Sequence, residues 1–324
     1  MKKTLILAIA VTILTTFSGK NLIAQTKEDA GNAFNAALEL SKTDMAGAVV
    51  KMQDVVKMTT ALGKEGDTLK MKAGTVLPVW QYNVGNNLIK EKKYSEAIAA
   101  FEKSNEFAIT FSDANIKEKS ENILVKLYTS EGNNLLKAEK ADDAIVYLDK
   151  ALKLDPDFSK AYFTKGQVYK KKGDNVKMQE NMELALASAK KSNDTVTGNA
   201  AKNAIGSSLY LEGKTAFTKK AYGDAVEKLN KAITYDYKNK ELYYLLATSN
   251  NNLKKYDDAI AAANLGLPME EQTADKMARF YYEIAKAYEG KKDVANACAN
   301  YKKSAIGTFK SSADYQMKTV LKCQ

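Results

Sequence analysis

The sequence predicts an all-α fold in which about seven helix pairs stack into a solenoid, followed by a C-terminal capping helix. One spacing returns seven times: a small residue, another small residue twelve positions later, a bulky residue four further on, and a small residue three after that. Two pairs of copies follow each other at a period of 34 residues, 125–158 with 159–192 and 206–239 with 240–273. Three prolines in 324 residues and 45% apolar residues also suit continuous helix. A fixed period of this size is typical of stacked two-helix units.

Residues 1–24 are predicted to be a secretory signal peptide. A basic start at Met1–Lys3 precedes the uncharged, largely apolar run Thr4–Phe17, and cleavage is expected after Ala24. The apolar run is too short to span a bilayer as a finished helix, but it fits the central region of a signal peptide. The mature chain, 25–324, is therefore expected to be periplasmic or secreted, with no stable membrane insertion after cleavage.

Each repeat is expected to hold an A helix and an antiparallel B helix, which approach closely where small residues occupy unit positions 8 and 20. The expected repeats are 29–62, 78–111, 125–158, 159–192, 206–239, 240–273 and 278–311. Their position-8 and position-20 pairs are Ala36/Ala48, Gly85/Ala97, Gly132/Ala144, Gly166/Met178, Gly213/Ala225, Ala247/Ala259 and Ala285/Ala297. Position 24 is expected to fill the space beside each pair, with Met52, Phe101, Leu148, Met182, Leu229, Ala263 and Tyr301.

The segments between and after the repeats are predicted as follows. Lysines end helix A, and a Ser or Asp such as Ser95 or Asp257 is expected to cap helix B. Of the three insertions, 63–77, 112–124 and 193–205, the first should contain a loop at 63–67 and the second should lengthen helices. Residues 312–323 should form the cap, with Tyr315, Val320 and Leu321 available to cover the last apolar face.

The pattern resembles the tetratricopeptide (TPR) repeat, which has Gly or Ala at positions 8 and 20, a bulky residue at 24, Ala at 27 and Pro at 32. Copy 125–158 matches best and ends with Pro156, the only proline at position 32, whereas Met178 departs from the small residue expected at position 20. The resemblance implies a right-handed α-solenoid whose concave face is lined by helix A positions 2, 5, 9, 12 and 13. It also implies that this groove often holds peptides.

Candidate ligand-binding residues follow from those groove positions. Position 5 is aromatic in five repeats, at Tyr82, Phe163, Tyr210, Tyr244 and Tyr282. Polar groups follow one helical turn later at position 9, as Asn86, Asn133, Gln167, Lys214 and Lys286. Tyrosine offers a large contact area at low entropy cost, and amides pair with an extended backbone. Alternatively, these rings pack against neighbouring helices A and only stiffen the stack.

The two cysteines of the chain, Cys298 and Cys323, lie near the start of the last B helix and near the end of the cap. If the chain reverses near Lys310, they come opposite each other, and an even cysteine count in an exported protein favours a disulfide. The alternative is two unpaired thiols.

No enzyme, metal site or cofactor is predicted. The chain has no histidine, which removes His-dependent nucleophile arrangements, His-based zinc sites and the usual neutral-pH proton shuttle. The formal charge is +10, but Arg279 is the only arginine and acids are interleaved with the lysines, so no nucleic-acid partner is expected.

The function expected from the sequence is that of a non-enzymatic exported adaptor or scaffold. It would bind protein or peptide segments in its concave groove, for assembly of an envelope complex. Lysines on the inner faces of the third and fourth repeats would suit a moderately acidic segment; they are Lys126, Lys137, Lys160, Lys170 and Lys171. The alternative is a carbohydrate-binding module of the cell envelope that uses the groove tyrosines, although Trp80 falls outside the predicted groove.

Overall fold

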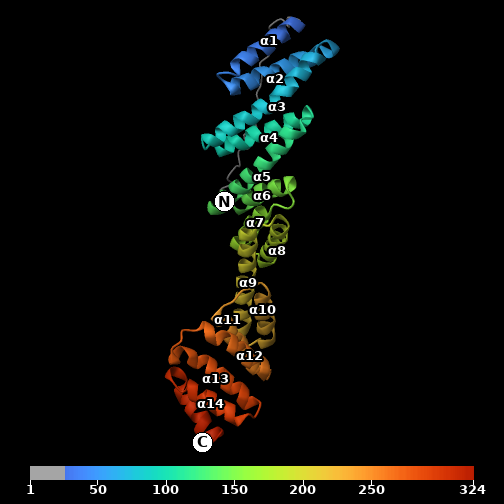
Figure 1. The fold of residues 1–324 in the computed structure, drawn as a ribbon. Coiled ribbons are helices and arrows are strands. Elements are labelled where there is room, and N and C mark those ends of the chain that lie inside the picture. The colour runs from blue at the N-terminus through green and yellow to red at the C-terminus, as the bar shows by residue number, and fades with distance from the viewer. Residues whose placement is uncertain (1–25) are drawn as a thin grey trace, which may run out of the picture. The chain divides into compact units, whose positions relative to one another are not determined.

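The computed structural model describes residues 26–324, so the predicted signal peptide lies outside the described residues. All regular structure in residues 26–324 is helical, which confirms the all-α prediction. The chain divides after Leu124 into two compact units. The helices are labelled in Figure 1. None of the helices in residues 26–324 is long and apolar enough to cross a membrane.

Unit 1 contains the first two predicted helix pairs. Its elements are α1 (Lys27–Leu40), α2 (Met45–Ala61), the 3₁₀ turn η1 (Gly63–Glu65), α3 (Asp67–Lys90), α4 (Tyr94–Thr110) and the first part of α5 (Ala114–Lys137). Each helix from α1 to α3 packs against the next one. The core between them is built from fully or almost fully buried side chains, which include Ala37, Met52, Val55, Ala73 and Leu77.

Unit 2 begins within α5 and continues the same alternation of A and B helices. Its further elements are α6 (Ala141–Leu154), α7 (Ser159–Lys172), α8 (Asn175–Ser192), α9 (Thr195–Thr218), α10 (Tyr222–Thr234), α11 (Lys240–Asn252), α12 (Tyr256–Gly266), η2 (Leu267–Met269), α13 (Ala274–Gly290), α14 (Val294–Ser304), η3 (Gly307–Phe309), α15 (Lys310–Tyr315) and η4 (Gln316–Val320). The predicted fourth to seventh repeats correspond to the pairs α7/α8, α9/α10, α11/α12 and α13/α14. In addition, α7 contacts α9, α9 contacts α11 and α11 contacts α13, so successive A helices lie next to each other.

The packing of position 8 against position 24 is the internal contact of each repeat. A Cβ atom on Gly213 would lie 2.8 Å from Cδ2 of Leu229, and one on Gly132 would lie 2.7 Å from Cγ of Leu148. A real Cβ atom at these distances would collide with the leucine side chain. Glycine at position 8 therefore allows the position-24 side chain of helix B to pack directly against the backbone of helix A. In the sixth repeat both positions are alanine, and the fully buried Phe280 of the next repeat packs instead against Gly266, at position 27.

The first repeat corrects one predicted pair. The structure buries Ala37 completely and leaves Ala36 exposed, while Ala48 is fully buried as predicted. The small pair is therefore Ala37/Ala48, eleven residues apart rather than twelve.

The missing residue of the first repeat belongs to the end of its A helix. In the other six repeats, position 15 has a left-handed backbone, with φ near 60° at Lys92, Glu139, Lys220, Lys254 and Lys292 and φ 76° at Gly173. Residues 41–44 contain no such position. α1 ends three residues after Ala37 and four turn residues follow, whereas α3 ends five residues after Gly85 and three turn residues follow. The end of helix A is therefore two residues shorter and the turn one residue longer, which explains why the spacing rule placed α1 in the wrong register.

The start of helix B also differs from the prediction in several repeats. Ser95 and Asp257 lie inside the first turns of α4 and α12, and the N-cap positions are Lys93 and Lys255, which make no side-chain capping bond. Aspartate does cap α2, α8 and α14, through Asp44, Asp174 and Asp293. The serine or aspartate prediction is therefore wrong for the Lys-Lys-Tyr turns and correct for these three helices.

The insertions mainly lengthen A helices. The second one, 112–124, supplies most of the first half of α5, as predicted, and the third extends the start of α9 back to Thr195. In the first one, η1 and Gly66 form the predicted loop, but Asp67 already begins α3. Pro78 consequently lies inside α3 rather than at its start.

The C-terminal cap covers the last repeat with Leu321, as predicted, and with Ala313 and Met317, which the prediction did not include. Ala313, Met317 and Leu321 pack against the cluster of Ala285, Ala297 and Tyr301. Tyr315 and Val320 are 58% and 47% exposed, so the prediction was wrong for these two residues. Ala313, Met317 and Leu321 are spaced by four residues and so share one face of a helical segment, whereas Tyr315 and Val320 do not lie on that face.

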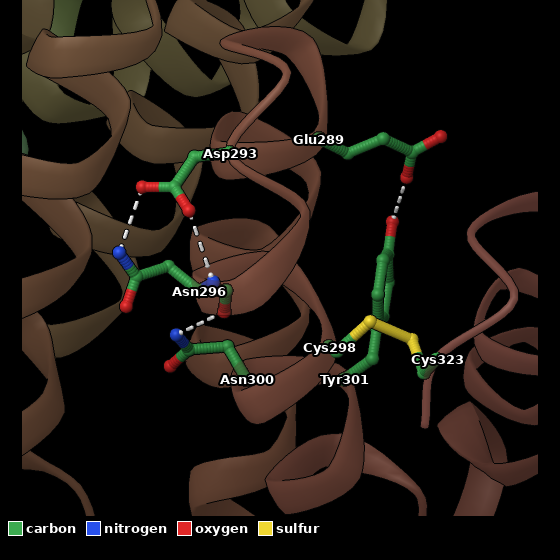
Figure 2. The surroundings of a disulfide bond; sticks show 7 residues. All are labelled: Glu289, Asp293, Asn296, Cys298, Asn300, Tyr301 and Cys323. Atoms are coloured by element: carbon green, nitrogen blue, oxygen red, sulfur yellow. Dashed lines mark hydrogen bonds between the residues drawn. A yellow bond between two sulfur atoms is a disulfide. The ribbon is translucent and has the colours of Figure 1, made fainter.

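The two cysteines lie beside this cap (Figure 2). Cys298 of α14 and Cys323, three residues after η4, have Cα atoms 5.8 Å apart and sulfur atoms at disulfide distance. The predicted meeting of the two cysteines is confirmed. Close by, the hydroxyl of the buried Tyr301 donates a hydrogen bond of 2.5 Å to Glu289 (Figure 2).

Candidate binding face

The predicted ligand-binding residues of unit 2 lie on successive A helices. Positions 5 and 9 are one helical turn apart and so share one face of each helix. Of these side chains, Lys214 is exposed and the others are half-buried: Asn133, Phe163, Gln167, Tyr210, Tyr244, Tyr282 and Lys286. The corresponding residues of the third and sixth repeats are the buried Thr129 and the half-buried Thr248. We call the positions 5 and 9 of α7, α9, α11 and α13 the A face.

Two of the A-face tyrosines have a ring partner within their own repeat. The ring of Tyr210 lies 5.8 Å from that of Tyr237, and the ring of Tyr282 lies 5.1 Å from that of Phe309, measured between centroids. Tyr237 and Phe309 both occupy position 32, where the TPR pattern has proline. Aromatic pairs at such distances are attractive. These two rings therefore stabilise the end of their own repeat, rather than packing against a neighbouring helix A, and remain partly exposed.

Sequence reasoning missed this pairing, although a signal was present. An aromatic residue stands at position 32 in the fifth and seventh repeats, and both of these repeats have tyrosine at position 5. The third repeat has Pro156 at position 32 and Thr129 at position 5. The signal is limited to these repeats, because the other aromatic residues at position 5 stand with Ile109, Lys190 and Glu271 at position 32.

Tyr244 is held by the next repeat rather than by its own. The guanidinium carbon of Arg279 lies 4.9 Å from the ring centroid of Tyr244, and the Phe280 ring meets it edge-on at 5.9 Å. Burial raises the pKa of Tyr244, and the nearby carboxylate of Glu283 adds to that effect. Because a cation covers its ring, Tyr244 contributes less open surface than the sequence indicates.

Arg279 itself is fixed by two carboxylates. It donates to Glu241 at 2.6 Å and to Glu270 at 2.5 Å, and Lys240 also donates to Glu270 at 2.5 Å. Burial alone would raise the pKa of Glu270, but the hydrogen bonds from Lys240, the Glu271 backbone and Arg279 outweigh it and lower that pKa. Glu270 is therefore a buried anion with two cationic partners, which joins α11 to α13.

The two lysines at position 9, Lys214 and Lys286, differ in whether an acidic side chain pairs with their charge. The ammonium group of Lys286 lies 3.2 Å from the carboxylate of Glu283, which is 4% exposed and also accepts a hydrogen bond of 2.7 Å from Asn251. Lys214 is exposed and makes no ion pair within the described chain. Of the two lysines, Lys214 is the one whose charge remains available to a partner.

The remaining two predicted residues, Tyr82 and Asn86, lie in unit 1 on α3. Both are half-buried, and the ring of Tyr82 meets that of Phe101 edge-on at 5.3 Å. Phe101 is the position-24 residue of the same repeat and is fully buried. Tyr82 thus packs onto its own helix pair, as Tyr282 does onto Tyr301 in the last repeat.

The A face offers aromatic edges, amides and one free ammonium group, which is chemistry for binding.

Among residues 26–324, no three or more Asp, Glu or Cys side chains gather in a way that could hold a metal ion. The acid pairs that begin α6 and α12 lie in the first turn of their helices, where negative charge is stabilised by the helix dipole.

Comparison with known proteins places the chain among repeat proteins. Three family models described as tetratricopeptide repeat match it, one at 147–180, one at 210–274 and one at both 125–158 and 278–305. Among solved structures, YrrB, "a TPR protein with an unusual peptide-binding site", is 19% identical, with 63% of this chain and 96% of YrrB covered and a TM-score of 0.35. A structure of MamA is 21% identical, with 61% and 95% covered and a TM-score of 0.30.

A search among curated proteins found no match. The matched residues, 125–180, 210–274 and 278–305, all lie in unit 2, between α5 and α14. From these matches and the helical architecture we conclude that the chain is a tetratricopeptide repeat protein.

Proposed function

We propose that this TPR protein is an exported adaptor that binds segments of partner proteins on its A face and performs no chemistry of its own. The observation that carries the proposal is the repeated pairing of a half-buried ring at position 5 with a polar group at position 9. It occurs on four consecutive A helices, as Phe163/Gln167, Tyr210/Lys214, Tyr244/Thr248 and Tyr282/Lys286. Partly exposed rings provide rigid contact area, and the polar groups can pair with a peptide backbone.

The open part of the A face is centred on α7 and α9. Phe163 and Gln167 have no aromatic or ionic partner across the A face, and Lys214 is exposed, whereas Tyr244 is covered by Arg279 and Tyr282 by Phe309. A segment bound at α7 and α9 would meet a ring, an amide and a positive charge. We therefore expect a partner segment with an apolar side chain and an acidic residue, used in assembling a complex of the cell envelope.

Site-specific photo-cross-linking tests this proposal. A photoreactive residue at Lys214 should capture a discrete protein from envelope extract, whereas the same residue at Val146, which is 56% exposed on the B helix α6, should not. Lys214→Glu should weaken capture by a cross-linker placed at Gln167 without changing the helical circular dichroism, because Lys214 has no internal partner. Equal capture from both sites, or none from Lys214, would overturn the A-face proposal.

Export is tested separately. Cell fractionation should place the protein outside the cytoplasm, and N-terminal sequencing should find Gln25 as the first residue. A cytoplasmic protein that keeps Met1 would remove the envelope role and leave the binding face to be judged by the cross-linking experiment.

A further inference from the structure

The Cys298–Cys323 disulfide borders a pocket of about 630 Å³ at the C-terminal end of unit 2 (Figure 2). Both cysteines are half-buried and both line this pocket, together with the exposed Val294 and the half-buried Met317. A disulfide that lies at the wall of a surface pocket can be reached by a thiol from solvent, whereas one inside a packed core cannot.

Two lysines place positive charge beside the disulfide. Lys302 lies one helical turn after Cys298 on α14, and Lys322 directly precedes Cys323. Both lysines are exposed and line the pocket, neither makes an ion pair within residues 26–324, and no acidic side chain of that part of the chain lines the pocket. Positive charge attracts an incoming thiolate and stabilises the thiolate that leaves, so it speeds thiol–disulfide exchange at this site.

The segment that the disulfide fastens has little packing of its own. We call residues 305–324 the tail, and Ala313 is the only one of them that is buried. The helical parts of the tail, α15 and η4, are six and five residues long, and helices of this length are not stable alone. The disulfide is therefore the strongest attachment of the far end of the tail to the last repeat.

The tail also covers one end of the A face. The ring of Phe309, in η3, lies 5.1 Å from that of Tyr282 between centroids, and Tyr282 packs against the cluster that contains Ala313. If the tail left the last repeat, Tyr282 would lose the Phe309 ring and keep its edge-on contact with Tyr301. Tyr282, at position 5 of α13, would then present more of its ring on the A face.

We propose that the Cys298–Cys323 disulfide is a redox latch: a dithiol protein reduces it, the tail leaves the last repeat and Tyr282 opens. One thiolate of the dithiol attacks a sulfur atom of the pair, so the Cys298–Cys323 bond breaks and a mixed disulfide forms. The second thiol of the dithiol then displaces that cysteine. The dithiol becomes a disulfide, and Cys298 and Cys323 become thiols with the two electrons and two protons that it gives up. The exchange does not depend on the adaptor function, and only the use of the opened Tyr282 rests on it.

Reduction kinetics test the site, with dithiothreitol as the dithiol and the oxidised chain 25–324 in buffer without denaturant. Mass spectrometry after alkylation should find two thiols, and the rate should fall as salt is added. Lys302→Gln with Lys322→Gln should slow reduction about threefold or more and weaken its salt dependence, because the charges that attract and stabilise thiolates are gone. The matched control is Lys303→Gln with Lys318→Gln, which changes the net charge equally outside the pocket and should leave the rate unchanged.

Hydrogen exchange and nitration test the opening of the tail. The backbone amides of Leu321 and Cys323 donate to the carbonyls of Gln316 and Met317. After reduction and alkylation they should exchange about tenfold or more faster, while amides of α11 stay protected. Tetranitromethane should then nitrate Tyr282 about threefold or more faster.

Two controls accompany the opening experiment. Tyr210, which pairs with Tyr237 and not with the tail, should be nitrated at the same rate in both states. Cys298→Ser with Cys323→Ser, which needs no alkylation, should behave like the reduced chain.

Three outcomes would overturn the latch. They are a disulfide that dithiothreitol reduces only in urea, equal slowing by the two lysine pairs, and a tail whose exchange is the same with and without the disulfide. None of these measurements needs a partner, so a failure of the latch leaves the adaptor proposal to its own cross-linking test.

Discussion

The turn between helix A and helix B offers the sharpest test of the structure. In the fifth repeat, Lys220 has φ 60°, a left-handed conformation that costs an L-residue about 1–2 kcal/mol. The turn is a Schellman motif: the Ala221 N–H donates to the Ala216 carbonyl at 2.9 Å and the Lys220 N–H to the Phe217 carbonyl at 2.8 Å. Glycine is the residue usually found at such a position. Lys220→Gly should therefore stabilise the protein.

Two opposing contributions set the change in the free energy of unfolding that Lys220→Gly causes. Glycine removes the left-handed strain but adds about 0.5–1 kcal/mol of backbone entropy to the unfolded chain. The net gain for Lys220→Gly should be about 0.5–1 kcal/mol. The neighbouring Lys219 is equally exposed but has φ −81°, so Lys219→Gly keeps only the entropic cost and should destabilise by about 0.5–1 kcal/mol.

The fourth repeat supplies the reverse experiment. Gly173 has φ 76° and nothing within 4 Å of the place where a Cβ would be, so Gly173→Ala changes backbone strain without a clash. It should destabilise the protein. Urea unfolding followed by circular dichroism measures all three variants, with amide hydrogen exchange in the α9/α10 pair to detect local opening. If Lys220→Gly and Lys219→Gly have the same sign, or Gly173→Ala is neutral, the left-handed turn assignment is wrong.

Three further predictions concern packing, the cap and alkaline pH. Gly213→Ala should destabilise by about 1–3 kcal/mol through overpacking, whereas Gly31→Ala, in open space within α1, should stabilise by up to about 1 kcal/mol, both measured by urea unfolding. Serine at both Cys298 and Cys323 should cost about 3.5 kcal/mol in the chain-entropy model, measured as lower thermal stability; mass spectrometry that finds two free thiols in the unreduced wild type would contradict this. Burial and a hydrogen bond raise the pKa of Tyr301, so the fold keeps a proton that unfolded tyrosine loses near pH 10; stability should fall above about pH 10, and less steeply in Tyr301→Phe.

The repeat architecture could be predicted because it depends on side-chain size at fixed spacing. Leu148, Leu229 and Tyr301 at position 24 are all fully buried, as the pattern required, and Gly132 and Gly213 lie where only glycine fits. These contacts are local to one helix pair and are repeated, so several copies support the same inference. A pattern with this redundancy tolerates a single deviating residue.

The errors occur where a helix ends. The left-handed position 15, which follows helix A in six repeats, is lysine in four of them and glutamate in another, residue types that give no sign of positive φ. In the first repeat, α1 ends three residues after Ala37, whereas α3 ends five residues after Gly85, and this early end places the buried small residue at Ala37 instead of Ala36. The prediction of the cap residues was partly wrong for a related reason. The cap is a six-residue helix followed by a π-helical turn, and it packs Ala313 and Met317, rather than Tyr315, against the last repeat.

The candidate site could be predicted only in part, because a solenoid position can serve its own repeat, the next repeat or a partner. Position 5 illustrates the first two uses. Tyr210 and Tyr282 contact position 32 of their own repeat, Tyr244 contacts Arg279 of the next one, and Phe163 has no ring partner among residues 26–324. The sequence shows an aromatic residue in each case, and only the contacts distinguish them.

The same reasoning explains why a departure from the repeat is more informative than agreement with it. A residue that matches the pattern is accounted for by packing, whereas Asn250 stands at position 11, which is leucine in the second and third repeats, and its buried side-chain oxygen has no hydrogen-bond partner among residues 26–324. An unpaired buried acceptor is costly, so Asn250→Leu should raise the thermal stability of the protein, measured by circular dichroism. If Asn250→Leu instead lowers the thermal stability, the asparagine side chain has a stabilising role that outweighs the cost of its unpaired oxygen.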